Sequence, residues 1–198
     1  SPESFDHIAK VKTSCDRVIV LFHSGLEHYR YPSPRLQRVC RAMVRAGANL
    51  VVCQHSHCIG CKEEYSSGTI VYGQGNFLFA KSSRRNDSAW NTGLILRLSI
   101  DNNSISVSYV PVLSHDGKVE LAKGNDRIDI MKGFLDRSEK IKSLGFIEES
   151  FEELAQDSMA RYTSIMLALP RLLYIINKLF RNTITRLLLS RKRAVVSL

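Results

Sequence analysis

The sequence predicts an α/β fold with a mixed β-sheet, followed by C-terminal helices. An apolar strand, a helix and a second apolar strand follow one another over residues 17–52, and a hairpin is predicted over 93–112. With 198 residues, 44% of them hydrophobic, the chain can bury a sizeable core. This composition excludes a disordered polyelectrolyte. No stretch has the ~18–20 uncharged apolar residues of a membrane-spanning helix.

The first half of the chain is predicted to form a β-α-β unit. Residues 17–22 are a short, β-branched apolar run, typical of a buried parallel strand. Two prolines then break the chain, and Ser33 or Pro34 is placed to start a helix. Apolar residues recur at helical spacing over 36–44. Gly47 is suited to end this helix, and residues 50–52 form the next strand. The crossover is expected to be right-handed.

The second half of the sheet is predicted to be antiparallel. Residues 69–72 and 76–79 are expected to be strand pieces around a Gly-Gln-Gly break, and 62–68 a loop. Residues 93–100 and 104–112 predict a hairpin, because Asp-Asn-Asn separates two apolar runs.

Helices and positive charge dominate the C-terminal part. Helices are predicted at 126–142 and 147–169. The formal net charge is +9, yet residues 158–198 hold eight basic side chains and no acidic one, so the body is nearly neutral. The basic amphipathic segment 171–193 is expected either to lie on an anionic membrane surface or to pack on protein. No aromatic platform accompanies the charge, so no nucleic-acid partner is expected, and the predicted location is peripheral membrane-associated or cytoplasmic.

Histidines follow two of the predicted parallel strands. His23 ends the first strand, and His55 and His57 follow the second. Because ligands bind beyond the carboxyl ends of strands in open α/β sheets, we expect the two loops to lie side by side. Imidazoles together with a carboxylate, which Glu27 offers, suit Zn, Mn, Fe or Ni. The alternatives are a hydrogen-bonded structural role for each histidine and a solvent-facing Glu27.

The five cysteines, an odd number, argue against a disulfide framework and favour reduced thiols, as in the cytosol. Cys58 and Cys61 form a C-x-x-C motif, with Cys53 nearby. A small structural zinc protein using all three is one hypothesis, although no second C-x-x-C completes the usual four ligands. A redox pair would sit at the start of a helix, whereas a loop is predicted here. Packed, inert thiols are therefore expected.

Three segments occur in an order typical of one family: DRVIVLFHSGLE at 16–27, AGANLVVCQHSH at 46–57 and IVYGQGNFLF at 70–79. They resemble the capsule-synthesis protein A family, the CapA/PgsA proteins of poly-γ-glutamate synthesis, which are calcineurin-like metallophosphoesterases. The resemblance implies the C-terminal half of a metallophosphoesterase-type α/β/β/α sandwich. The implied boundaries are 1–114 for this half-domain, 115–157 for a helical extension and 158–198 for the basic amphipathic tail.

The resemblance also implies a site with metal-binding, catalytic and substrate-binding residues. The metal ligands would be His23, His55 and His57, the catalytic carboxylate Glu27, and the substrate-binding residues Gly75 and Asn76. The cofactors would be divalent Mn, Fe or Zn ions, as a dinuclear site in the full-length family fold. The family's upstream Gly-Asp strand and Asn-His pair have no counterpart here. The site is therefore expected to need a missing N-terminal half or a complementing chain.

The expected function is that of a CapA-like protein of bacterial capsule or poly-γ-glutamate biosynthesis, acting with other capsule-synthesis components. The implied chemistry is that of a metal-dependent hydrolase, with little or no phosphodiesterase activity from this chain alone. A catalytically silent binding or assembly module of the same fold is the alternative.

Overall fold

The chain divides into two compact units, residues 1–147 and 148–198. The first unit holds both β-sheets, and the second holds most of the last helix. The computed structural model describes residues 2–78, 90–101, 104–115, 117–166 and Ile175.

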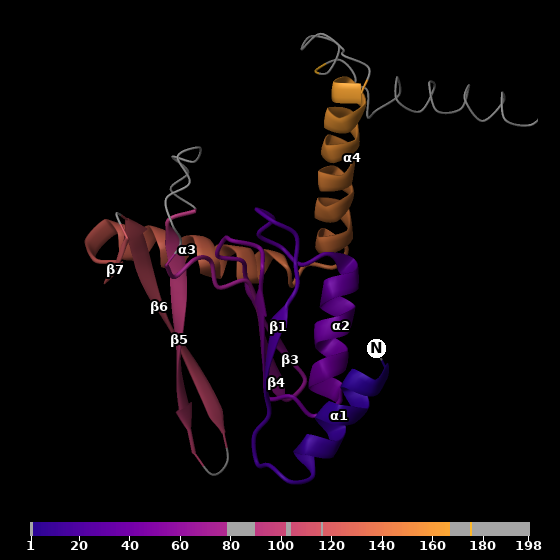
Figure 1. Ribbon diagram of the computed structural model, residues 1–198, viewed down its shortest axis with the longest axis vertical. Coiled ribbons are helices and arrows are strands. Elements are labelled where there is room, and N and C mark those ends of the chain that lie inside the picture. The colour runs from indigo at the N-terminus through magenta and orange to yellow at the C-terminus, as the bar shows by residue number, and fades with distance from the viewer. Residues whose placement is uncertain (1, 79–89, 102–103, 116, 167–174, 176–198) are drawn as a thin grey trace, which may run out of the picture. The chain divides into compact units, whose positions relative to one another are not determined.

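A mixed four-stranded sheet lies at the centre of the first unit (Figure 1). Its strands are β1 (Ile19–His23), β2 (Leu50–Gln54), β3 (Lys62–Tyr65) and β4 (Gly68–Tyr72). The strand order is β1-β2-β4-β3, with β1, β2 and β4 parallel and β3 antiparallel to β4. The predicted mixed sheet and its parallel beginning are confirmed.

Helix α2, Pro34–Arg45, is the crossover between β1 and β2. Ser33 caps its start, because the Ser33 side chain accepts a hydrogen bond from the backbone N–H of Leu36 at 3.1 Å. Pro34 fits the first turn, where a helix needs no N–H donor. Gly47, at φ 118°, turns the chain just after the helix. The predicted start and end of this helix are confirmed.

Two segments differ from their predicted conformation. Residues 62–68, predicted as a loop, contain β3 and a turn in which Ser66 has a φ of 53°. β3 is short and charged, which suits an edge strand, so it lacks the apolar pattern that marks a core strand. Residues 76–78, predicted as part of a strand, form none, because Gly75 at φ 74° turns the chain out of an extended path.

Helices cover one face of the sheet. Helix α1, Pro2–Lys12, which was not predicted from the sequence, and α2 both pack there. Every second residue of β2 and β4 faces these helices, so their apolar runs are buried on both faces. The buried residues of this layer include Ile8, Leu36, Cys40, Met43 and Val44 from the helices and Val51, Cys53, Ile70 and Tyr72 from the strands.

A second, antiparallel sheet covers the other face. It consists of β5 (Thr92–Ile100), β6 (Ile105–His115) and β7 (Lys118–Leu121) in that order. The predicted hairpin is confirmed as β5 and β6, and β7 extends it. The contact between the sheets joins Leu50, Val52 and Val71 to Leu96, Leu98, Val107 and Tyr109. Helices, sheet and sheet thus form three successive layers.

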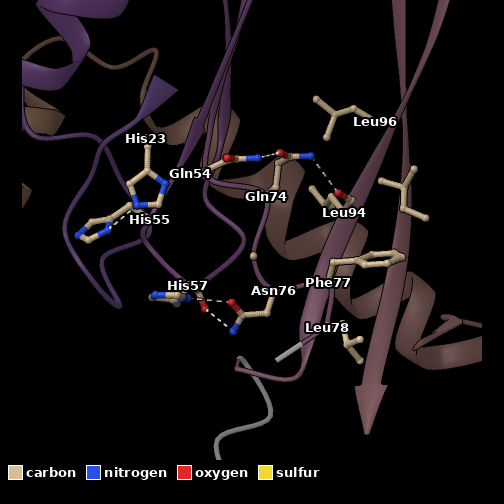
Figure 2. A pocket seen from close by; sticks show the side chains of 12 residues that line it. His23, Gln54, His55, His57, Gln74, Asn76, Phe77, Leu78, Leu94 and Leu96 are labelled. Carbon is tan, nitrogen blue, oxygen red and sulfur yellow. Dashed lines mark hydrogen bonds between the residues drawn. The ribbon is translucent and has the colours of Figure 1, made fainter. Parts of the chain in front are cut away.

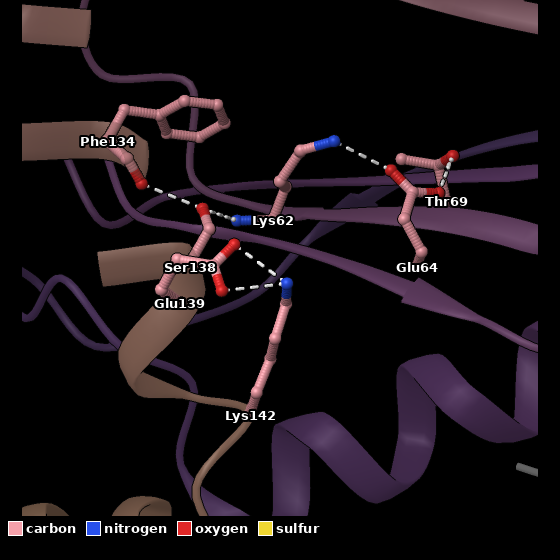
Figure 3. Close-up of polar contacts among 7 residues, drawn as sticks. All are labelled: Lys62, Glu64, Thr69, Phe134, Ser138, Glu139 and Lys142. Carbon is pink, nitrogen blue, oxygen red and sulfur yellow. Dashed lines mark hydrogen bonds and ion pairs between the residues drawn. The ribbon is translucent and has the colours of Figure 1, made fainter. Parts of the chain in front are cut away.

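Helix α3, Gly124–Lys140, is tied to β3 through one hydroxyl group (Figure 3). Ser138 Oγ accepts a hydrogen bond from the backbone N–H of Lys62 at 2.9 Å and donates one to the Phe134 carbonyl at 2.7 Å. Phe134 is fully buried and packs in a core cluster with Ile59. The helix therefore supplies a partner to the backbone of β3.

Helix α4, Phe146–Met166, matches the last helix predicted ahead of the tail, and its first turn is acidic, as expected. Within the described part of the chain, no helix combines the length and hydropathy needed to cross a membrane. The amphipathic helix predicted at 171–193 lies outside the described residues, apart from Ile175.

Candidate functional site

The carboxyl ends of β1 and β2 bring two histidines together. His23 is the last residue of β1, and His55 follows β2 directly. His55 Nδ1 lies 3.2 Å from His23 Nε2, and the two ring centroids are 5.0 Å apart (Figure 2). Because parallel neighbours end at the same edge of a sheet, the predicted juxtaposition of the two loops is confirmed.

Backbone hydrogen bonds join these two loops. The N–H of Ser24 donates to the Gln54 carbonyl at 3.0 Å, and the N–H of His28 donates to the Ser56 carbonyl at 2.8 Å. The loops therefore form one connected rim at the end of the sheet.

Three histidines of the rim have a positive φ: 61° at His28, 99° at His55 and 54° at His57. Residues other than glycine rarely adopt this conformation. Such strain costs about 1–3 kcal/mol per residue and is concentrated at binding and catalytic sites. Three such residues in two connected loops support the choice of this rim as the candidate functional site.

His57 is held apart from the histidine pair. Its Nδ1 lies 2.9 Å from Asn76 Oδ1, and its ring packs on Trp90 with the centroids 4.8 Å apart. The ring centroids of His55 and His57 are 6.2 Å apart. The three predicted ligands are therefore a contacting pair, His23 and His55, with His57 beside it.

A cavity of about 560 Å³ lies next to these rings. Gly75 and Asn76, the predicted substrate-binding residues, both line it. Its polar lining also includes the three histidines, Gln54 and Gln74, and its apolar lining consists of Phe77, Leu78, Leu94, Ile95 and Leu96 (Figure 2). A cavity in which an apolar wall faces a set of converging polar groups is typical of small-ligand sites.

The polar wall contains an amide pair that was not predicted. Gln54 Nε2 donates to Gln74 Oε1 at 3.1 Å, and Gln74 Nε2 donates to the Leu94 carbonyl at 3.3 Å. The position of Gln54 directly before His55 was the available signal in the sequence. Nothing in the sequence marked Trp90 beyond its being the one tryptophan. The described lining residues include no Asp, Glu, Lys or Arg, so histidine is their one titratable type.

Glu27, the predicted catalytic carboxylate, is exposed and does not line the cavity. Among the residues that the structure describes, no group of three or more His, Cys, Asp and Glu side chains is arranged to hold a metal ion. His23 and His55 are thus a pair of nitrogen donors, and the roles predicted for Glu27 and His57 stay predictions.

The cysteines of the first unit are mostly core residues. The Sγ atoms of Cys40 and Cys53 are 3.4 Å apart, and Cys58 and Cys61 are buried as well. Burial raises the pKa of the Cys61 thiol, which disfavours the thiolate that would bind metal or react. The prediction of packed thiols is confirmed for these four, whereas Cys15 is exposed.

The C-x-x-C turn is held by hydrogen bonds from α3 and by close packing against β4. Arg137 of α3 donates from Nε to the Gly60 carbonyl at 2.8 Å and from a terminal nitrogen to the Ile59 carbonyl at 3.1 Å. A Cβ at Gly60 would lie only 1.8 Å from the Tyr72 carbonyl oxygen. The turn therefore lies so close to β4 that a side chain at residue 60 would clash with it, which explains why this residue is glycine.

Comparison with known proteins covers the part of the chain that contains this rim. Residues 2–81 match the family model described as bacterial capsule synthesis protein PGA_cap. The capsule biosynthesis protein CapA of Bacillus anthracis is 36% identical over 107 residues, which are 54% of this chain and 25% of that protein. The PGA biosynthesis protein CapA of Bacillus subtilis (strain 168) is 38% identical over 90 residues, 44% of this chain and 24% of that protein.

The matched region thus spans about a quarter of the length of these relatives. The family match over residues 2–81 contains strands β1 to β4 and the three predicted ligands His23, His55 and His57. Residues 2–81 are therefore similar to the PGA_cap/CapA capsule-synthesis family, as a partial match to its members.

Proposed function

We propose that this chain acts in bacterial capsule or poly-γ-glutamate biosynthesis as one part of a CapA-like, metallophosphoesterase-type fold, and that its rim supplies histidine ligands to a divalent metal site. The observation that carries the proposal is the 3.2 Å approach of His23 Nε2 and His55 Nδ1 at the ends of two parallel strands. The family match over residues 2–81 supports the biosynthetic role.

The donor set fits a metal ion in part. Two ring nitrogens that bind the same tetrahedral ion, each at about 2.0–2.1 Å, lie roughly 3.3–3.4 Å from one another. The observed distance between His23 Nε2 and His55 Nδ1, 3.2 Å, is close to this value. Imidazole suits Zn, Mn or Fe. His23 and His55 would hold one ion, and His57 would contribute a ligand beside it. The further ligands would come from a segment outside the described residues.

When bound, a divalent ion would polarise a phosphoryl or amide-type centre and lower the pKa of a bound water. The residues of this chain would hold and orient the reacting groups. The neutral amides of Gln54 and Gln74 and the apolar side chains around them offer a surface for the uncharged part of a substrate. Without further ligands we expect little or no phosphodiester hydrolysis.

The partner that this proposal requires would join the sheet at β1. Leu21 of β1 is 70% exposed, while Val52, its register partner on β2, is 3% exposed. Both side chains point to the same face, which the second sheet covers at Val52. A complementing segment, in the same polypeptide or in another capsule-synthesis component, would extend both the sheet and the covering layer over β1.

Metal analysis of the purified chain after equilibration with Zn²⁺ or Mn²⁺ tests the metal site. We expect binding in the unmodified chain, loss in the double variant His23→Ala/His55→Ala and retention in the matched double variant Cys58→Ser/Cys61→Ser. Loss in the cysteine variant alone would support the structural zinc hypothesis instead. Turnover of a chromogenic phosphodiester by the metal-loaded chain, abolished by His57→Ala, would contradict the proposed need for further ligands.

A catalytically silent binding or assembly module is the second candidate. It is favoured by the lack, among the described residues, of three or more metal-ligating side chains grouped around one point. Absence of bound metal in the unmodified chain, with the fold intact by circular dichroism, would support this candidate.

The proposed location is peripheral to a membrane or cytoplasmic, with residues 171–193 as the contact to anionic lipid. Co-sedimentation with vesicles of phosphatidylglycerol and phosphatidylcholine tests this. We expect binding by the full chain and its loss when residues 171–198 are removed. Equal binding by both chains would contradict a membrane role for this segment.

A further inference from the structure

The side chain of Asn76 is oriented by its neighbours. Asn76 Nδ2 donates to the Trp90 carbonyl at 2.8 Å. The His57 carbonyl lies 3.5 Å from the same nitrogen (Figure 2). Both neighbours are carbonyl oxygens, which accept hydrogen bonds and never donate them. Turning the amide round would set oxygen against oxygen, so the network assigns Oδ1 to the side that faces the His57 ring.

The backbone of Asn76 is also held in place. Its N–H donates to the Thr92 carbonyl at 3.0 Å, and the residue is only 5% exposed. Gly75 forms a bridge with Gly93, where a Cβ would lie 2.1 Å from the Asn76 carbonyl oxygen. This approach needs glycine, and it fixes Asn76 against the start of β5.

An oxygen opposite Nδ1 determines which nitrogen of the His57 ring carries the proton. Asn76 Oδ1 accepts only, and it lies 2.9 Å from His57 Nδ1, so the neutral ring carries its hydrogen on Nδ1. The lone pair then lies on Nε2. The Trp90 indole packs on the ring with 33° between the planes and restricts the ring's rotation.

We propose that Asn76 is a positioning residue that locks His57 in the Nδ1–H tautomer and so presents Nε2 as the nitrogen that binds a metal ion or takes a proton. The use of Nε2 rests on the proposed function, whereas the tautomer does not. The His55 ring differs, because its partner is the His23 ring, which can donate or accept. Hydrogen-bond partners of this kind orient ligating histidines, and their loss typically weakens metal binding by about 10-fold or more.

Nitrogen-15 NMR of the histidine rings in the full chain tests the proposal, at about pH 8, where imidazoles of ordinary pKa are neutral. We expect a pyrrole-type Nδ1 and a pyridine-type Nε2 for His57, with resonances assigned by their loss in His57→Gln. Asn76→Leu removes the acceptor, so the proton is expected to move to Nε2 and reverse the two resonance types. Gln74→Leu removes an amide from the same segment and should leave the His57 resonances unchanged.

A pyridine-type Nδ1 in the unmodified chain would overturn the proposal, whether or not Asn76→Leu folds. Unchanged His57 resonances in a folded Asn76→Leu variant would overturn it as well. Zn²⁺ titration of the same samples separates this proposal from the metal site: an Asn76-dependent tautomer without Zn²⁺ binding leaves the positioning role standing and removes the proposed metal function. If Zn²⁺ binds, we expect its affinity to fall about 10-fold or more in Asn76→Leu.

Discussion

β1 and β3 form the two edges of one sheet, yet they meet their surroundings differently. β3 is short and charged, and Ser138 of α3 gives its backbone a partner. β1 is apolar up to His23, and Leu21 on one of its faces is 70% exposed. Charges and covering elements protect an edge from further pairing, whereas a bare apolar strand invites it. Among the described strands, the contrast supports the proposal that a further segment joins the sheet at β1 and not at β3.

The candidate site takes residues both from the exposed edge strand β1 and from the buried part of the sheet. His23 comes from the open strand β1, while His55 follows the buried strand β2 and His57 is held by Asn76 and Trp90. A segment added beside β1 would arrive next to His23. The exposed strand β1 and the further ligands that the proposed metal site needs therefore belong to the same proposal.

The largest effect is expected when the same substitution, leucine to alanine, is made on the neighbouring strands β2 and β1 and the free energy of unfolding is compared. Leu50 of β2 is 1% exposed and packs against the second sheet, so Leu50→Ala should lower the free energy of unfolding by about 3 kcal/mol. Leu21→Ala, on the open face of β1, should change it by less than about 0.5 kcal/mol. Urea unfolding followed by circular dichroism measures both. Equal losses in the two variants would mean that β1 is covered in solution and would break the comparison.

A smaller effect is expected at the protected edge. Glu63 of β3 accepts hydrogen bonds from Arg41 Nε at 2.9 Å and from the Tyr72 hydroxyl at 2.7 Å. Glu63→Ala leaves both donors without this carboxylate and should lower the free energy of unfolding by about 2 kcal/mol. Lys118→Ala, in the exposed strand β7, is the control and should change it by less than about 0.5 kcal/mol. An unchanged free energy of unfolding in Glu63→Ala would show that this hydrogen-bond network does not stabilise the edge.

The smallest effect is a pH dependence at the same edge (Figure 3). Burial raises the pKa of Glu64, but hydrogen bonds from Lys62 and Thr69 lower it more, so the net pKa is below its ordinary value of 4.5. The stability that this carboxylate contributes is therefore present above pH 4.5 and is lost as the pH falls through its folded-state pKa. Because the group is largely exposed, the contribution should not exceed about 0.5 kcal/mol.

Urea midpoints of the unmodified chain and Glu64→Gln between about pH 3 and pH 7 measure this contribution. The difference between the two chains should shrink as the pH falls. A difference that grows on acidification would have the wrong sign for a lowered pKa and would refute the assignment.

The sequence predicted those features that depend on local pattern and parallel topology. Ser33, Pro34 and Gly47 marked the ends of α2. The parallel pairing of β1 and β2 placed His23 and His55 at the same edge of the sheet. β3 was missed because a charged edge strand carries no apolar alternation.

Other features depend on contacts between distant segments. The exposure of Leu21 depends on which elements cover that face of β1. The apolar sequence of β1 carries no information about those elements. The orientation of Asn76 depends on the carbonyl of Trp90, 14 residues away in the chain. The sequence pattern therefore predicted that the two histidine loops lie side by side. How the side chains of the candidate site are oriented followed only from the packed structure.

The central claim, that the histidine rim and not the thiols carries the metal chemistry, is tested most directly by the absorption spectrum of the Co²⁺-loaded chain. We expect visible bands of nitrogen- and oxygen-bound Co²⁺ that disappear in His55→Ala and persist in Cys58→Ser/Cys61→Ser. A thiolate-to-cobalt charge-transfer band that persists in His55→Ala and disappears in the cysteine variant would contradict the claim.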